Sequence, residues 1–232
     1  MDIVNKVSIL KEWSPEKLGP SRALVHTLRY KYLMGVGTDL SPLLSRPAEE
    51  VFKTWDVISA SLVDLGRMQG ASADSDAETM AFGELALVLD VPIQNILGTH
   101  AYDVSFPNHI GTQPGRNGST QVTNSYALVD AIYSGVTKNP GKKVAGGFNQ
   151  LCTPMELLGR TARVMSNHNE VLLVGRPHIN IYQGLGVTSP IKVREVWVLS
   201  KTQDLNRKAF LVSKAQQIMA INKIAGSPKI IL

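Results

Sequence analysis

The spacing of apolar residues is helical through most of the first hundred residues. The clearest case is 47–69, where Val51, Trp55 and Ile58 belong to a series of apolar positions three and four residues apart. Apolar spacing or capping residues predict further helices at 2–12, from Pro15, at 21–34 and at 75–89. We therefore expect a mainly helical N-terminal part with about five helices.

Beyond residue 99, helical and extended patterns are mixed. Helices are expected at 125–134, 153–165 and 204–225, and strands, rich in β-branched residues, at 170–176, 178–183 and 191–201. The polar stretch 99–125 is either a functional loop or a pair of weakly signalled strands. The predicted fold class is α+β: a helical N-terminal part, then a small, mostly antiparallel sheet and a final helix.

Length and composition are those of a folded chain with a substantial core. The 232 residues are 44% hydrophobic and 19% charged, and fit one large domain or two small ones. No stretch is long and apolar enough to predict a transmembrane segment. The N-terminus mixes acidic and basic residues into its apolar ones, so we expect no signal peptide and a cytoplasmic or virion location.

The charge is distributed unevenly along the chain. Residues 1–98 hold nine Lys/Arg and thirteen Asp/Glu, a net charge of −4, whereas residues 99–232 hold fifteen and six, a net charge of +9. We interpret these as a helical acidic region and a mixed, basic region, which also fit one continuous domain. Such polarity either steers a polyanion to one region or draws copies of the chain together.

The basic residues of the second region are the candidate nucleic-acid contacts. Arg160 and Arg163 are one helical turn apart, and Lys192 and Arg194 are two apart on an expected strand, so each pair is predicted to share a face. Charge of this kind binds a nucleic-acid backbone without reading its sequence. The full set is Arg116, Lys138, Lys142, Lys143, Arg160, Arg163, Arg176, Lys192, Arg194, Lys201, Arg207 and Lys208.

Residues 83–97, GELALVLDVPIQNIL, suggest an alternative, because their apolar positions match a helix-turn-helix. A DNA-binding regulator is therefore a second hypothesis. Asp90 occupies the turn position that glycine usually fills, and only Gln94 and Asn95 are available to read bases. The segment also lies in the acidic region, which DNA would repel.

Cys152 supports a third hypothesis, an enzyme with this residue in its site, because it precedes an expected helix N-terminus that favours a thiolate. No phosphate-binding loop, nucleophile elbow or metal-ligand spacing accompanies it. We therefore expect no enzyme, no cofactor and no metal site. The leading hypothesis is a self-assembling structural protein, of the viral capsid, nucleocapsid or matrix kind, that coats or packages nucleic acid as a homo-oligomer.

Overall fold

A computed structural model describes residues 3–35, 41–55, 57–68, 83–102, 137–138, 142–143, 151–165, 168–177, 179–200 and 202–231. The helical elements are α1 (Ile3–Lys11), α2 (Pro15–Leu18), α3 (Tyr30–Leu33), α4 (Ser41–Ser45), α5 (Ala48–Phe52), α6 (Leu65–Met68), the 3-10 turn η1 (Ile93–Asn95), α8 (Pro154–Arg163) and α9 (Leu205–Ile221). The strands are β1 (Arg22–Leu28), β2 (Val57–Asp64), β3 (Leu85–Asp90), β4 (Ile96–His100), β5 (Thr137–Lys138), β6 (Lys142–Lys143), β7 (Glu170–Val174), β8 (Lys192–Val198) and β9 (Lys229–Ile230).

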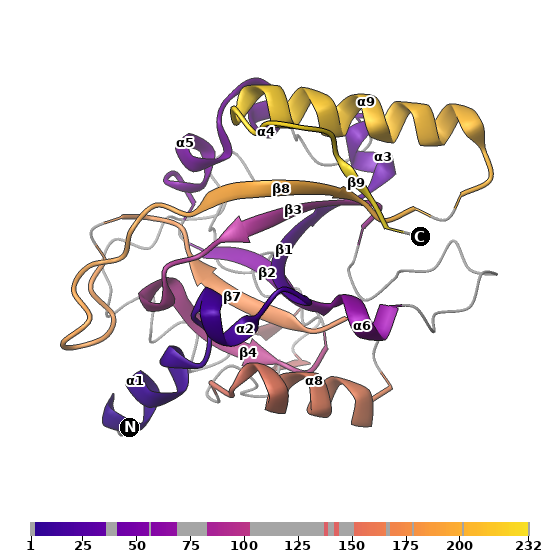
Figure 1. The fold of residues 1–232 in the computed structure, drawn as a ribbon. Helices are drawn as coiled ribbons and strands as arrows, with labels where there is room; N and C mark the ends of the chain where they lie inside the picture. The colour runs from indigo at the N-terminus through magenta and orange to yellow at the C-terminus, as the bar shows by residue number, and fades with distance from the viewer. Residues whose placement is uncertain are drawn as a thin grey trace.

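A twisted seven-stranded sheet is the centre of the fold (Figure 1). Its strand order is β4-β7-β2-β1-β3-β8-β9, so residues 1–98 and 99–232 contribute strands to the same sheet. Neighbours are antiparallel except β8 and β9, which are parallel. β5 and β6 form a separate pair.

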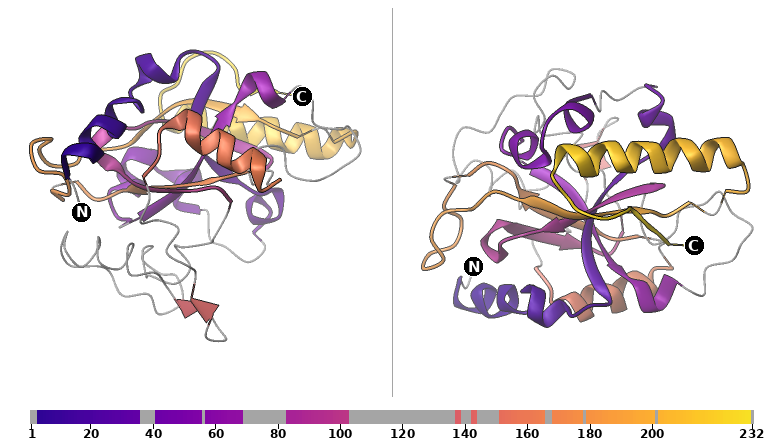
Figure 2. Two further views of the ribbon diagram at one scale, coloured as in Figure 1. Left: turned by 90° about the horizontal axis from the view of Figure 1, so that it is seen from below. Right: turned by 45° about the horizontal axis from the view of Figure 1, so that its top comes forward.

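The sheet lies between two groups of helices: α4, α5 and α9 on one side, and α1, α2 and α8 on the other (Figures 1 and 2). Both groups contribute to one main core cluster, for example through Leu10, Leu157 and Leu211. A smaller cluster, with Val25 and Trp197 among its members, lies on the other side of the strands from the main-core residue Leu24, and Leu65 of α6 packs against it.

Two halves of the sheet meet at a short junction between β1 and β2. The register of this pair runs from Arg22–Asp64 to Val25–Ser61. From Val25 onward β1 pairs with β3, whereas the first half of β2, Val57–Ala60, pairs with β7. Beyond the Val25–Ser61 pair, β1 is hydrogen-bonded to β3 and β2 to β7, and no longer to each other. We call this region, residues 26–28 of β1 and 57–60 of β2, the split of the sheet.

The expectation of a mainly helical N-terminal part is wrong. Residues 47–69 form only the short helices α5 and α6, with the eight-residue strand β2 between them. The segment 21–34 forms β1 followed by the single turn α3, and the expected helix 75–89 ends in β3. β2 and β3 are central strands that are buried on both faces, so they are apolar at nearly every position and also satisfy a helical spacing.

The predicted C-terminal elements agree better with the structure. β7, β8, α8 and α9 are confirmed close to their expected bounds, although β7 and β8 join a large central sheet and not a small C-terminal one. Residues 179–183 were expected to form a strand and form none. The expected helix 125–134 lies outside the described residues.

Candidate functional site

Glu170, the first residue of β7, is a charged residue with 1% of its surface exposed. Val171 and Leu173 belong to the main core, and side chains alternate along a strand, so Glu170 points to the opposite side of β7. Burial of an ionised carboxylate is costly unless hydrogen bonds compensate for the lost water. Ionisable groups in perturbing environments cluster at functional sites, so Glu170 is a candidate functional residue.

A serine of the neighbouring strand supplies one such hydrogen bond. The Ser59 hydroxyl on β2 donates to Glu170 Oε1 at 3.0 Å. Two residues later the Ser61 hydroxyl donates to the backbone oxygen of Asn169 at 2.9 Å. The two serines lie on the same side of a strand that is otherwise largely apolar, so β2 presents a short polar strip to the start of β7.

The backbone before Glu170 is fixed by the side chain of Asn169. Asn169 Oδ1 accepts a hydrogen bond from Leu62 N at 2.8 Å, and Nδ2 donates to Leu62 O at 3.0 Å. Asn169 is itself buried. The position of the Glu170 carboxylate is therefore set by the attachment of Asn169 to β2 and by the Ser59 hydroxyl.

His100 is the residue directly opposite Glu170 on β4. Burial lowers the pKa of His100, more strongly than the hydrogen bond to the Tyr102 carbonyl raises it, so the imidazole is mainly neutral at pH 7. His100 Nδ1 lies 3.1 Å from Tyr102 O, and the two rings meet edge to face at 4.3 Å. Histidine and glutamate are both residue types that act as general acids or bases, and the strand register makes these two cross-strand neighbours.

The split of the sheet brings this cluster together. The β1–β2 register stops at Ser61, two residues from Ser59, and β7 and β4 place Glu170 and His100 next to it. A carboxylate held in this way accepts hydrogen bonds from ligand hydroxyl or amine groups and stabilises positive charge. The cluster is not among the residues predicted from the sequence, although a lone Glu before the apolar run VLLV and two serines within VISASLV were visible signals.

The predicted nucleic-acid contacts lie in several places. Arg160 and Arg163 are exposed on α8, as the helical spacing predicts. Lys192 and Arg194 are both exposed on β8 with the buried Val193 between them, and the register shifts between Val193 and Glu195. Arg207 and Lys208 are half-buried on α9, on the other side of the sheet from α8 (Figure 1).

Other members of the set are partly or wholly outside the described residues. Arg176 is half-buried after β7, and its carbonyl accepts a hydrogen bond from the Thr188 hydroxyl. In β5 and β6, Lys138 pairs with Lys142, and Lys143 with Thr137; the side chains of these lysines are not described. Arg116 and Lys201 are also outside the described residues.

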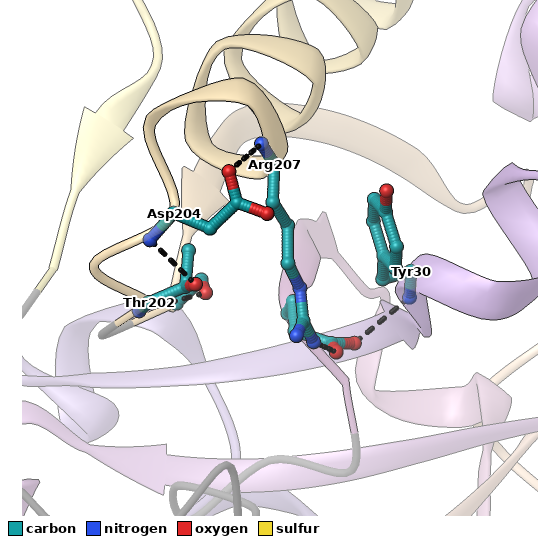
Figure 3. A network of polar contacts seen from close by, with 6 residues as sticks. Tyr30, Thr202, Asp204 and Arg207 are labelled. Carbon is teal, nitrogen blue, oxygen red and sulfur yellow. Dashed lines mark hydrogen bonds and ion pairs between the residues drawn. The ribbon is translucent and has the colours of Figure 1, made fainter.

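Arg207 is engaged within the chain (Figure 3). Its guanidinium forms an ion pair with Glu84 and lies over the Tyr30 ring at 4.7 Å. The second Glu84 oxygen accepts a hydrogen bond from Tyr30 N at 2.8 Å. These contacts join the start of α3, the residue before β3 and the first turn of α9, so we assign Arg207 a structural role.

The segment 83–97 does not form a helix-turn-helix. It consists of β3, the turn η1 and the beginning of β4. Asn95 is buried and bonds to the backbone of Val174 and Ser189, and Gln94 donates to Val187 O. The geometry on which the regulator hypothesis depends is therefore missing.

Cys152 is buried in the main core. Its sulfur lies 3.0 Å from the Thr99 hydroxyl oxygen, and its carbonyl accepts a hydrogen bond from the Trp13 indole at 2.9 Å. These contacts attach the residue pair before α8 to β4 and to the turn between α1 and α2. The position gives the thiol a packing role, and nothing in it favours nucleophilic chemistry.

The described residues contain neither a membrane-spanning helix nor a cluster of metal ligands. None of the described helices has the length and hydropathy that crossing a bilayer requires. No group of three metal-ligating His, Cys, Asp or Glu side chains occurs in this part of the chain. Of the histidine and aspartate positions in the polar stretch 99–125, only His100 is described.

Comparison with known proteins gives no relative: no family model, no curated protein and no solved structure matches this chain.

Proposed function

We propose that the split of the sheet is the binding and reaction site of an enzyme whose central group is Glu170. The observation that carries the proposal is the 1%-exposed carboxylate with the Ser59 hydroxyl 3.0 Å from it, on the side of β7 that faces away from the main core. The expectation of no enzyme rests on the absence of local catalytic motifs. A site assembled from β2, β4 and β7 leaves no local motif, because its residues are far apart in the chain.

The chemistry of the cluster indicates a ligand that is rich in hydroxyl groups, such as a sugar or a nucleoside. A fixed carboxylate accepts a ligand hydroxyl, and the low dielectric of its surroundings strengthens that hydrogen bond. The same negative charge stabilises a carbon that becomes positive during group transfer. Ser59 orients the carboxylate, and the neutral His100 next to it is the second group available for proton transfer.

A ligand screen with matched variants tests this proposal. Saturation-transfer NMR would use the full-length protein and a panel of sugars, nucleosides and nucleotides as probes. Glu170→Gln is expected to weaken binding of any hit by about tenfold or more, because the charge-assisted hydrogen bond is lost. Ser59→Ala is expected to have a smaller effect in the same direction.

Glu156→Gln is the control, because Glu156 is an exposed glutamate on α8. Its affinity for the hit is expected to equal that of the wild type. A panel without any hit, or a hit that Glu170→Gln binds as tightly as the wild type does, would contradict the proposal.

Nucleic-acid coating by a homo-oligomer remains a second proposal, supported by the exposure of Arg160 and Arg163 on one helix. Light scattering of the protein with a random oligonucleotide across a salt series tests it. Co-assembly that dissolves with salt is expected, and the double substitution R160Q/R163Q is expected to reduce the salt dependence. A chain that stays monomeric with and without the oligonucleotide at every salt concentration would exclude this function.

A further inference from the structure

His26 of β1 points to the side of the sheet that carries the main core. Leu24 and Leu28, two residues before and after it, share its face of the strand and belong to that core. Its ring meets Phe52 edge-on at 5.7 Å and Trp55 at 5.8 Å, and those two rings meet each other at 5.3 Å. The imidazole is therefore held in a defined orientation by the residues at and after the end of α5.

The hydrogen bond of His26 crosses to β2. His26 Nδ1 lies 2.8 Å from the backbone oxygen of Ser59. A carbonyl oxygen only accepts, so Nδ1 carries the proton. The β1–β2 register ends at Val25–Ser61, and the His26 side chain thus links the two strands just beyond their last paired residues.

Ser59 therefore has contacts in two directions. Its carbonyl accepts from His26, and its hydroxyl donates to Glu170 at 3.0 Å. We propose that His26 is a positioning residue, which fixes the backbone of β2 at Ser59 and thereby aims the Ser59 hydroxyl at the Glu170 carboxylate. This role rests on the proposed function of Glu170 and adds to it a residue that does not touch the ligand.

Two substitutions of His26 separate positioning from packing. His26→Phe keeps a ring between Phe52 and Trp55 but removes the donor. His26→Asn removes the ring but places an amide N–H close to the position of Nδ1, so the hydrogen bond to Ser59 is retained. A packing role predicts that Phe is the better replacement, and a positioning role predicts that Asn is.

The readout is the 13C resonance of the Glu170 carboxyl group in the full-length protein without ligand, assigned by its loss in Glu170→Gln. Ser59→Ala sets the shift that results from loss of the hydroxyl bond. His26→Phe is expected to move the resonance in the same direction by most of that amount, and His26→Asn is expected to leave it near the wild-type position. Circular dichroism of both variants verifies that they are folded.

The proposal is overturned if His26→Phe leaves the Glu170 resonance unchanged while Ser59→Ala moves it, or if both His26 variants move it equally. If His26→Phe does not fold, His26→Gln takes its place as the variant without the hydrogen bond. The glutamine side chain is one methylene longer than asparagine, so its amide N–H does not occupy the position of Nδ1. None of these measurements requires a ligand, so a failed ligand screen and a failed positioning role are distinguishable. For a ligand found in the screen, His26→Phe is expected to weaken binding about as much as Ser59→Ala does.

Discussion

The side-chain amide of Asn169 makes two hydrogen bonds to the backbone of Leu62, one as acceptor at 2.8 Å and one as donor at 3.0 Å. In this way Asn169 imitates a strand residue and binds β2 just before β7 begins. The next residue is Glu170, so the same amide fixes the base of the candidate site. The buried Asn169 side chain therefore supports both the β2–β7 contact and the position of Glu170.

We expect Asn169→Asp to lower the free energy of unfolding by about 2–3 kcal/mol. The substitution removes the donor to Leu62 O and leaves a buried acceptor without its partner. Urea denaturation followed by circular dichroism measures the change. Asn206→Asp, at an exposed position in the first turn of α9, is the control and is expected to change stability by less than about 0.5 kcal/mol; equal losses in the two variants would refute the argument.

Gly175 has no room for a side chain. A Cβ at this position would lie 2.4 Å from the backbone oxygens of both Phe52 and Trp55, which cannot move without distorting the chain after α5. We expect Gly175→Ala to destabilise the fold by about 2 kcal/mol or more. Gly159 lies in α8 with open space around it, and Gly159→Ala is expected to stabilise by about 0.5–1 kcal/mol. Thermal unfolding of the two variants should therefore shift in opposite directions, and a shared direction would be the contrary result.

The first turn of α8 makes stability depend on acid pH. The backbone N–H and hydroxyl of Thr153 donate to Glu156, and these bonds, aided by Arg160, hold the pKa of Glu156 below its ordinary value of 4.5. This contribution to stability is complete above pH 4.5 and is lost as the pH falls through the lower pKa of the folded state. Glu156→Gln is expected to flatten that part of the stability–pH profile in denaturant titrations, whereas an unchanged slope would contradict the assignment.

The ion pair of Arg207 with Glu84 is expected to contribute more than a typical surface pair. Both side chains are 22% exposed, and Glu84 also binds Tyr30 N. A double-mutant cycle with Glu84→Gln and Arg207→Met should give a coupling energy of about 1–2 kcal/mol. The pair Lys53–Glu49, four residues apart near α5 and 38% and 36% exposed, should give about 0.5 kcal/mol or less. Similar coupling in both cycles would show that burial of the first pair has no effect.

Local signals predicted the elements whose ends carry specific capping residues. The Thr153–Glu156 capping box marks the start of α8, and the structure contains both of its hydrogen bonds. Asp204 caps α9 through the backbone N–H groups of Asn206 and Arg207. Figure 3 shows the bond to Arg207. These contacts lie within three residues of one another, so the sequence alone contains them.

The central strands could not be separated from helices by the same means. LALVL in β3 and the apolar run of β2 are buried on both faces, which removes the alternation that identifies a strand. The candidate site was missed for a related reason. Neither the burial of Glu170 nor its contact with Ser59, 111 residues away, can be predicted from the residues that are adjacent in the sequence.

The order of the strands has a consequence for synthesis on the ribosome. β1, β2 and β3 emerge within the first ninety residues, but β7 and β8, which flank them, are more than seventy residues further along the chain. Until those arrive, Val57–Ala60 lacks its partner β7 and Leu85–Val88 has one unpaired edge, and unpaired strand edges of this kind recruit other chains. Ribosome stalling or proteolysis before residue 170 would therefore release fragments prone to aggregation.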